Sequence, residues 1–390
     1  MKIALALSGG GHRASSFHLG VLHFLAEKQL IENVEVVSST SGGSILVAQL
    51  FHLDTDSSDG EGSEQALVWP TSEQLLTLVM AQTEAKIVDE SLENGFIRRM
   101  FRPSNWFKFG HRANLMAEVI KKRWGISAQM KDLPMRPSWV INGAANITGS
   151  RWFVQKDKAG HKIGSHDIGF ADAGDFPIAD AVALSAAYPG VIGPYRLDSQ
   201  NYNWDYAQND EDNQSLLQSK KGLYLSDGGL YDNLGIEPLF NLEQSSLVYS
   251  NTDYLVVSDA GNGLKRQRLA PVWRPLLRTI RLINVINQQV RALRLRTLVS
   301  FFDNNPSQGL YIPIGTSFCQ WKEDREIKGE VIPQALLDYR FLSLAEVTIA
   351  KNSPTSLASL SSEQFERLVR HGYESAMMQF SITQFAIKSL

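Results

Sequence analysis

The sequence predicts an α/β protein: a three-layer α/β/α sandwich with a mainly parallel central sheet, a helical insertion and a C-terminal helical extension. Two strand–turn–helix units occupy the first fifty residues. Later apolar segments also run into short turns of glycine and serine, and helical periodicity dominates residues 65–135 and much of the chain after residue 262. This alternation is typical of a parallel sheet covered by helices on both faces.

The first two units show the pattern most clearly. Residues 3–7 form a short apolar strand that ends at Ser-Gly-Gly-Gly, and apolar residues then recur at three- and four-residue spacing between residues 13 and 25. The β-branched segment 34–37 ends at Ser-Ser-Thr-Ser-Gly-Gly, and residues 45–51 again favour a helix. These periodicities predict the start of a doubly wound sheet with right-handed crossovers.

The rest of the chain is predicted to complete one large domain and an extension. The domain covers residues 1–262, with the helical insertion at about 65–135, and residues 263–390 form a mainly helical extension packed on it. Further strands are predicted at 139–144, 151–154, 223–225 and 254–257, and a short helix within 181–190 that a Pro-Gly pair ends.

Two acidic segments are predicted to be surface loops. Residues 197–219 hold five carboxylates and no Lys or Arg. Residues 54–64 are rich in Asp, Ser and Gly and invite comparison with a calcium loop of the EF-hand type. Asp59 stands where that loop needs glycine and Gln65 where it needs glutamate, so a calcium site is not expected there.

Composition excludes several classes of protein. Hydrophobic residues make up 43% and charged residues 20% of the 390 residues, an ordinary globular balance. The net charge of −3 gives no reason to expect nucleic-acid binding, and the single Cys319 allows no internal disulfide. No apolar run approaches the roughly 18–20 residues of a membrane span. The N-terminal MKIALAL is expected to be a strand rather than a signal segment, so a cytoplasmic protein is expected.

Two segments could contact a lipid surface. Residues 265–296 carry nine Lys or Arg and no acid, with Arg274, Arg278 and Arg281 on one helical face. Their apolar face is predicted to hold Leu276, Ile280, Ile283, Val290 and Leu293. The second segment is the aromatic run at 106–109. For each the alternative is ordinary packing, as a core-packed helix with a solvated basic face or as a buried aromatic cluster.

Ser41 is the candidate nucleophile. It lies between an apolar strand and a helix in Ser39-Thr40-Ser41-Gly42-Gly43, which resembles the G-x-S-x-G elbow with Ser39 in place of the first glycine. Such a tight turn needs small neighbours, and Gly43 supplies the second one. The positive end of the following helix would stabilise an oxyanion beside the serine. A plain strand-to-helix loop is the alternative.

Gly9, Gly10 and Gly11 form a candidate anion nest. They stand between the first strand and the first helix, where successive backbone N–H groups can converge on one point. The nest could bind a phosphate or form an oxyanion hole, and neither the Walker nor the dinucleotide glycine pattern is present. Since the ends of adjacent parallel strands lie side by side, proximity to Ser41 favours the oxyanion hole.

Asp227 is the candidate base. It follows a short apolar strand and precedes Gly228 and Gly229, so its carboxylate could reach Ser41 at the carboxyl edge of the sheet. A turn aspartate that bonds its own backbone is the alternative. None of the eight histidines lies in a late strand-end loop of the kind that supplies a catalytic histidine, and His371 lies in a helical segment.

Three motifs together resemble the patatin-like phospholipase family. They are S-G-G-G-H-R at 8–13, S-T-S-G-G at 39–43 and D-G-G-L-Y-D-N-L-G at 227–235, and the segment 183–189 is similar to the family's A-S-x-A-A-P block. The resemblance spans about residues 1–262, which would form the catalytic domain. Ser39 and Ala14 stand where the family usually has glycine.

The resemblance implies a Ser41–Asp227 dyad without histidine. Gly9, Gly10 and Gly11 would form the oxyanion hole with Arg13 nearby, and the remaining glycines of the motifs, Gly43, Gly228 and Gly229, would support the turns. Asp232 is expected to fix its loop rather than to act as a second base. No metal ion or other cofactor is implied.

The implied activity is that of a phospholipase A or related serine acyl hydrolase, which would cleave fatty-acyl esters of glycerophospholipids through an acyl-Ser41 intermediate. A general carboxylesterase, thioesterase or neutral-lipid lipase with the same dyad stays open, as does a non-catalytic module whose glycine nest holds an anion. The expected partners are a phospholipid or other acyl-ester substrate, a peripheral site at the inner membrane surface, and a regulatory partner or ligand of unknown identity.

Overall fold

The computed structural model describes residues 1–390 except 54–66, 207–210, 250, 264–268, 272 and 389–390. The predicted surface loop at 54–64, where a calcium site is not expected, therefore lies outside the described residues. No helix among the described segments is long and apolar enough to cross a membrane.

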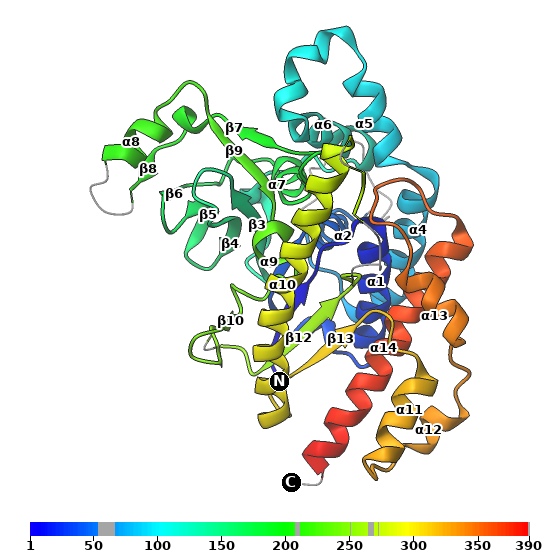
Figure 1. The fold of residues 1–390 in the computed structure, drawn as a ribbon. Helices are drawn as coiled ribbons and strands as arrows, with labels where there is room; N and C mark the ends of the chain where they lie inside the picture. The colour runs from blue at the N-terminus through cyan, green and yellow to red at the C-terminus, as the bar shows by residue number, and fades with distance from the viewer. Residues whose placement is uncertain (54–66, 207–210, 250, 264–268, 272, 389–390) are drawn as a thin grey trace, which may run out of the picture.

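The core of the molecule is a mixed sheet whose central strands are mostly parallel (Figure 1). The parallel part has the order β13-β12-β1-β2-β3, and its strands are β1 (Ile3–Leu7), β2 (Val34–Thr40), β3 (Ser138–Ala145), β12 (Tyr254–Asp259) and β13 (Gly309–Pro313). Each predicted strand is present, and the predicted fold class is confirmed.

Antiparallel strands extend the sheet beyond β3; the sequence patterns predicted β4 and β9 as strands but not their direction, and they did not predict the other strands of this group. They are β4 (Arg151–Asp157), β5 (Gly160–Ser165), β6 (Gly169–Ala171), β7 (Tyr195–Leu197), β8 (Trp204–Asp205) and β9 (Leu223–Asp227), and β10 (Phe240–Asn241) and β11 (Ser246–Leu247) form a separate pair. β9 pairs antiparallel with the end of β3, so it enters the sheet from beyond its carboxyl edge.

Helices cover both faces of the sheet. They are α1 (Gly11–Glu27), α2 (Gly42–Phe51), α3 (Ser72–Gln74), α4 (Met80–Asp89), α5 (Leu92–Met100), α6 (Ala113–Trp124), α7 (Ile178–Ser185), α8 (Glu211–Leu217), α9 (Gly229–Asp232), α10 (Pro275–Asn304), α11 (Phe318–Ile327), α12 (Gln334–Asp338), α13 (Leu344–Lys351) and α14 (Ser362–Lys388). The predicted helical insertion is confirmed, because helices account for most of residues 72–124.

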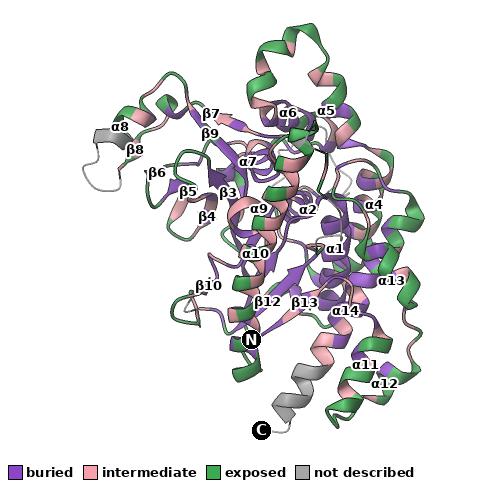
Figure 2. Cartoon of the chain, in the orientation of Figure 1, coloured by how far each residue is buried: buried purple, intermediate pink, exposed green. Residues whose placement is uncertain are grey.

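Alternate residues of the strands build two apolar cores, one on each face. Ile3, Leu5 and Leu7 of β1 belong to the larger core, which includes buried side chains of α1, α2 and α14. Ala4 and Ala6 face the smaller core, which includes the C-terminal part of α10. Since side chains alternate between the faces of a strand, both faces are covered, and β1, β2, β3 and β12 are buried throughout (Figure 2).

The C-terminal region is built into this architecture. β13 extends the sheet beside β12, and α14 packs along α1 (Figure 1). At their closest approach the two helices meet at glycines: a Cβ at Gly372 would overlap the carbonyl oxygen of Phe17, and one at Gly20 that of Val369. The division of the chain at residue 262 stays a prediction.

The structure decides three sequence expectations about surfaces: two are wrong, and for the aromatic run at 106–109 it excludes the alternative of a buried cluster. The acidic segment 197–219 contains α8, the end of β7 and β8 as well as loop. The aromatic run is not core: Trp106 is 60% and Phe107 74% exposed, because no apolar element covers the 3₁₀ helix η3 (Pro103–His111) in the described part of the chain.

The third expectation concerns α10, whose helical character is confirmed. Leu293 was expected on its apolar face but is 61% exposed, whereas Arg291 and Arg294 are largely buried. Arg291 forms an ion pair with Asp259, and Arg294 pairs with Glu237 at 3.1 Å. The buried carboxylate of Asp259 and the half-buried one of Glu237 under the helix thus select arginine rather than leucine for its inner face.

We expect Gly372→Ala to lower the free energy of unfolding by about 3 kcal/mol, because the added methyl group would force α14 away from α1. Gly110→Ala is the matched control, since a Cβ there meets nothing within 4 Å. Urea denaturation of both variants measures the difference. Equal stability of the two variants would contradict this helix contact.

Candidate active site

Ser41 lies at the sharp turn between β2 and α2. Its backbone has φ +51° and ψ −114°, a conformation that costs a non-glycine residue about 1–3 kcal/mol. The turn packs backbone to backbone on the first strand: a Cβ at Gly43 would lie 2.5 Å from the carbonyl oxygen of Leu7, and a Cβ at Gly42 would overlap that of Gly11. Gly42 is therefore as tightly confined as the predicted Gly43.

A chain of hydrogen bonds between buried hydroxyl groups stabilises this turn. The Ser41 N–H donates to Ser185 Oγ at 2.9 Å, and Ser185 Oγ lies 3.0 Å from Ser44 Oγ. Ser44 Oγ is 2.9 Å from Ser39 Oγ, which also accepts a hydrogen bond from Trp139 Nε1 at 2.8 Å. Ser39 thus fits where the family usually has glycine, because its buried hydroxyl is fully satisfied.

Asp227 lies beside Ser41 although its strand runs in the opposite direction to the one expected for a parallel sheet. Asp227 is paired with Gly143 of β3, and the preceding residue of β3, Asn142, is paired with Thr40 of β2. The carboxylate is only 4% exposed, accepts from Gly229 N–H at 2.6 Å and lies close enough to the Ser41 side chain for the serine to lower its pKa. The nucleophile and base predicted from the sequence are therefore in contact.

Burial dominates the electrostatics of this aspartate. It raises the pKa of Asp227 to about 7, and the hydrogen bond from Gly229 and the nearby Ser41 side chain only partly oppose it. A carboxylate with such a pKa changes its charge near neutral pH. It is a far stronger base than an exposed aspartate, whose pKa is about 4.

The glycine turn lies against the serine turn. A Cβ at Gly9 would lie 3.3 Å from the Cβ of Ser41. The Gly9 N–H already donates to the carbonyl of Asn233 at 3.0 Å, whereas no described residue accepts from the N–H groups of Gly10 or Gly11. Gly10 and Gly11 have φ of +148° and +62°, which glycine adopts readily. Of the three amides predicted to form the oxyanion hole, the N–H groups of Gly10 and Gly11 are therefore available to an oxyanion, and that of Gly9 is not.

Arg13 anchors this turn. Its guanidinium donates to the carbonyls of Ala260 at 3.1 Å and Ser353 at 2.7 Å, and burial lowers its pKa to about 10 despite the nearby charge of Asp259. The His12 N–H donates to the carbonyl of Ser356 at 2.9 Å. The segment before α14 therefore supports the glycine turn, a contact that no local sequence pattern indicates.

Two residues of the 227–235 motif support the site. Asp232 accepts from the N–H groups of Leu234 at 3.1 Å and Glu237 at 2.8 Å, which fixes the loop as predicted. Asn233 was not singled out from the sequence, yet a Cβ at Gly9 or Gly229 would come within 2.7 Å of its Oδ1. Gly228 packs on β3, since its Cβ would lie 2.5 Å from the carbonyl oxygen of Asn142.

Other candidate features lie apart from this site. His18 bonds Ser258 and Ser8, His371 accepts from Gly315, and among the described residues no hydrogen bond joins a histidine to Ser41 or Asp227. Within the described ranges no cluster of His, Cys, Asp and Glu could hold a metal ion.

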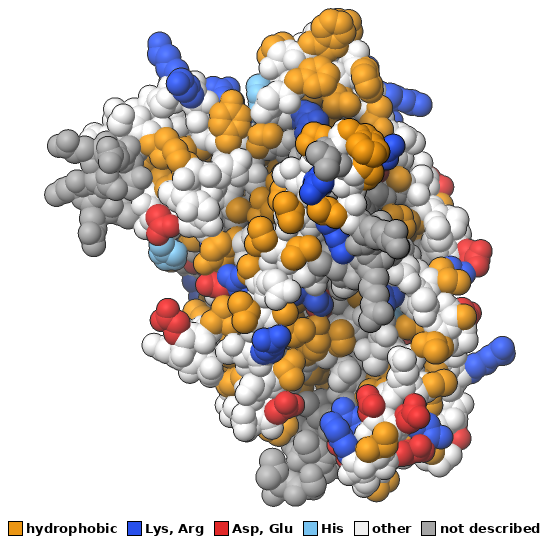
Figure 3. Space-filling model, in the orientation of Figure 1, with side chains coloured by type: hydrophobic (Ala, Val, Ile, Leu, Met, Phe, Trp, Pro, Cys, Tyr) orange, Lys and Arg blue, Asp and Glu red, His pale blue; other side chains and the backbone are white. Residues whose placement is uncertain are grey.

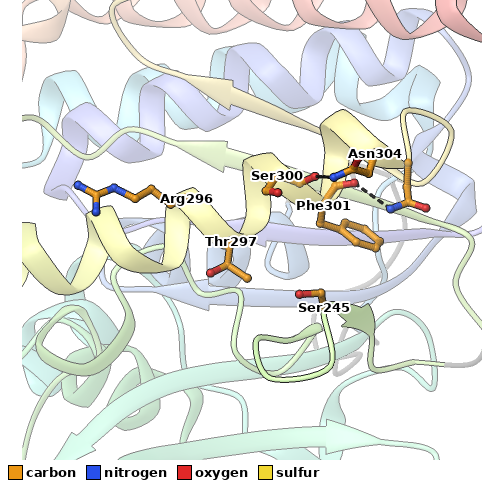
Figure 4. Close-up of a pocket in the computed structure, with 7 residues that line it drawn as sticks. Ser245, Arg296, Thr297, Ser300, Phe301 and Asn304 are labelled. Atoms are coloured by element: carbon orange, nitrogen blue, oxygen red, sulfur yellow. Dashed lines mark hydrogen bonds between the residues drawn. The ribbon is translucent and has the colours of Figure 1, made fainter.

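An open hollow beside the C-terminal half of α10 shares none of the site's residues. It is lined by Ser245, Arg296, Thr297, Ser300, Phe301, Asn304 and Asn305 (Figure 4).

The fold and the site define an α/β protein that holds a strained serine at a strand-to-helix turn against a buried aspartate. A family model described as Patatin-like phospholipase matches residues 5–240. The chain belongs to this family of lipid acyl hydrolases, which confirms the resemblance. No curated protein matches the chain.

Solved structures with a similar fold include human GIVD cytosolic phospholipase A2, at 13% identity and a TM-score of 0.48. The match covers 98% of this chain and 62% of that chain. VipD from Legionella pneumophila matches at 13% identity and a TM-score of 0.40, over 98% of this chain and 67% of that one. This chain thus spans less than two thirds of the human protein's length.

We expect Asp227→Asn to stabilise the fold increasingly as the pH rises. In the unfolded chain the carboxyl ionises near pH 4, so from there to about pH 7 ionisation costs the wild-type fold stability, up to about 4 kcal/mol. The asparagine has no charge to bury. Its advantage should therefore grow by about 2.5 kcal/mol between pH 5 and pH 8, measured by urea denaturation.

Asp324→Asn is the control for that experiment, because Asp324 is exposed on α11 and removal of its charge should have little effect at any pH. An Asp227→Asn advantage that does not depend on pH would contradict a buried carboxylate with a raised pKa.

Proposed function

We propose that this chain is a serine acyl hydrolase that cleaves fatty-acyl ester bonds of glycerophospholipids through an acyl-Ser41 intermediate. The observation that carries the proposal is the contact between strained Ser41 and buried Asp227, whose pKa of about 7 suits a general base at neutral pH. The amides of Gly10 and Gly11 belong to the glycine turn that lies against the Ser41 turn, at the N-terminus of α1.

In the first step Ser41 Oγ attacks the ester carbonyl carbon while its proton passes to the Asp227 carboxylate. The carbonyl oxygen becomes an oxyanion, which the N–H groups of Gly10 and Gly11 and the positive end of α1 stabilise. The intermediate then collapses, the bond to the alcohol oxygen breaks, and Asp227 returns the proton to that oxygen. The lysophospholipid leaves and the acyl group stays on Ser41.

In the second step water attacks the acyl-Ser41 carbonyl carbon and Asp227 takes one proton from it. Collapse of the second oxyanion breaks the bond to Ser41 Oγ, and Asp227 returns the proton to that oxygen. The products are a free fatty acid and the original serine. A single carboxylate serves both half-reactions, since it ends each one in the state in which it began.

We expect Ser41→Ala to abolish hydrolysis and fluorophosphonate labelling, and Asp227→Asn to lower kcat by a factor of about 1,000 or more, because the base is lost. The wild-type kcat/KM should rise with pH through an apparent pKa of about 7, since Asp227 must be ionised to accept the proton. Product analysis on a phospholipid panel, a neutral lipid, a simple ester and a thioester measures both activity and substrate class.

Peptide mapping of the labelled protein provides the decisive control. Label on a residue other than Ser41 would contradict the proposed nucleophile. Anion binding without any labelling would favour the non-catalytic module, and faster cleavage of simple esters than of phospholipids would favour a general carboxylesterase. The cytoplasmic location and a regulatory partner stay predictions.

Ser185 is expected to position the nucleophile rather than to react. Ser185→Ala would leave the Ser41 N–H without its acceptor, at a cost of about 1–3 kcal/mol. We expect kcat to fall about tenfold with KM nearly unchanged, because the loss affects the placement of Oγ and not substrate binding. Ser199→Ala is the matched control, since Ser199 is equally buried and its hydroxyl donates to Leu217. A similar loss of kcat in both variants would contradict a positioning role.

A further inference from the structure

One end of the molecule carries an aromatic lobe, residues 92–124, formed by α5, η3 and α6 (Figure 1). Its tip exposes four large rings: Phe101 at 66%, Trp106 at 60%, Phe107 at 74% and Phe109 at 45%. The lobe holds eight Lys or Arg and two Glu, so its net charge is 8 − 2 = +6 although the whole chain has −3. Exposed rings with this excess of positive charge mark a binding surface.

The tip is an ordered structure and not a loosened part of the core. Glu118 of α6 forms ion pairs with Arg99 and with Lys108, the latter at 2.8 Å, and Asn105 Nδ2 donates to the carbonyl of Arg99 at 2.9 Å. Below these contacts α6 buries much of its apolar face in the main core. Polar contacts therefore fix η3, while the rings project without cover.

The cations beside the rings are available to a partner. Arg98 and Arg102 flank Phe101, are exposed, and have no acidic partner among the described residues. Aromatic rings on a basic surface match an anionic lipid bilayer, where the rings insert at the headgroup level and Lys or Arg attract the headgroups. Only one acid, Glu118, lies among η3 and its neighbouring helix α6, and it is already paired.

The lobe is also attached to the turn that supports the base. Arg112 donates to the carbonyl of Gly193 at 3.1 Å, and the Ala113 N–H donates to that of Pro194. At the start of the same turn the carbonyl of Ala187 accepts from the Asp227 N–H at 3.0 Å. A membrane that binds the lobe would therefore lie at the side of the molecule where this turn approaches Ser41 and Asp227.

The N-terminal half of α10 adds to this surface. Tyr188 of the turn donates to Asn284 at 2.7 Å, and Ile280 approaches Gly190. Beside these contacts the helix exposes Leu277, Leu282 and Ile286, and Figure 3 shows hydrophobic side chains over the lobe and along this helix.

We propose that the aromatic lobe docks the protein on anionic phospholipid bilayers. The inference deepens the proposed function, because it names the kind of surface from which the lipid substrate would reach Ser41, but vesicle binding itself does not require hydrolysis. The tip rings enter the interfacial region, and Arg98 and Arg102 select negative headgroups.

The test is flotation with vesicles of phosphatidylcholine alone and with added phosphatidylglycerol, on a Ser41→Ala background so that the lipid stays intact. We expect binding to require phosphatidylglycerol and to weaken with salt. Trp106→Ala/Phe107→Ala should weaken binding at least tenfold, and Arg98→Gln/Arg102→Gln about tenfold or more on anionic vesicles only.

Ile327→Ala/Val331→Ala is the matched control, because both side chains are 80% exposed and lie outside the lobe. It should bind vesicles like the parent protein. The proposal is overturned if neither the lipid charge nor either pair of lobe substitutions changes vesicle binding. It is also overturned if the protein binds no vesicles at all, and a protein partner then becomes the better candidate to bind the lobe.

A second measurement separates this proposal from the proposed function. With Ser41 intact, the lobe variants should cleave a short, water-soluble ester at the wild-type rate and vesicle phospholipid at least tenfold more slowly. Vesicle binding without cleavage of any ester would reject the hydrolase and leave the docking surface standing. Cleavage of both substrates at wild-type rates by the lobe variants would reject the docking surface alone.

Discussion

The close approach of two glycine turns sets the geometry of the whole site. The turn after β1 and the turn after β2 touch backbone to backbone, so that a side chain at Gly42 would overlap the carbonyl oxygen of Gly11. The contact brings the N-termini of α1 and α2 to the same end of the parallel strands. The positive ends of two helices therefore lie beside one serine hydroxyl, and any side chain larger than that of glycine would prevent this approach.

Two features of the site lower the stability of the fold locally: the strained backbone of Ser41 and the buried carboxylate of Asp227. Both persist because segments from distant parts of the chain surround them. Ser185 holds the serine turn, the 185–187 segment holds the Asp227 turn, and the segment before α14 braces Arg13 and His12. Residues 353–356, although outside the matched span of 5–240, thus contribute to the rigidity of the site.

Much of the fold and the centre of the site could be predicted from local patterns. Short apolar segments located β1, β2, β3, β4, β9 and β12, helical spacing located most helices, and small residues at strand ends located Ser41, the glycine turn and Asp227. Other features depend on contacts between remote segments. The sequence left open whether the rings of η3 are buried or exposed, and they are exposed because no element in the described part of the chain covers them; Arg291 faces inward only because Asp259 lies beneath it.

Local sequence patterns were enough to locate the turns of the chain and the residues at those turns, because glycine, serine and strand periodicity act over a few neighbouring residues. Packing between remote segments set the remaining features: β9 runs antiparallel to β3, the Gly9 amide is already bonded, and burial brings the pKa of Asp227 to about 7. Strand direction, amide pairing and desolvation all depend on which remote segments pack together, and no local pattern encodes that choice.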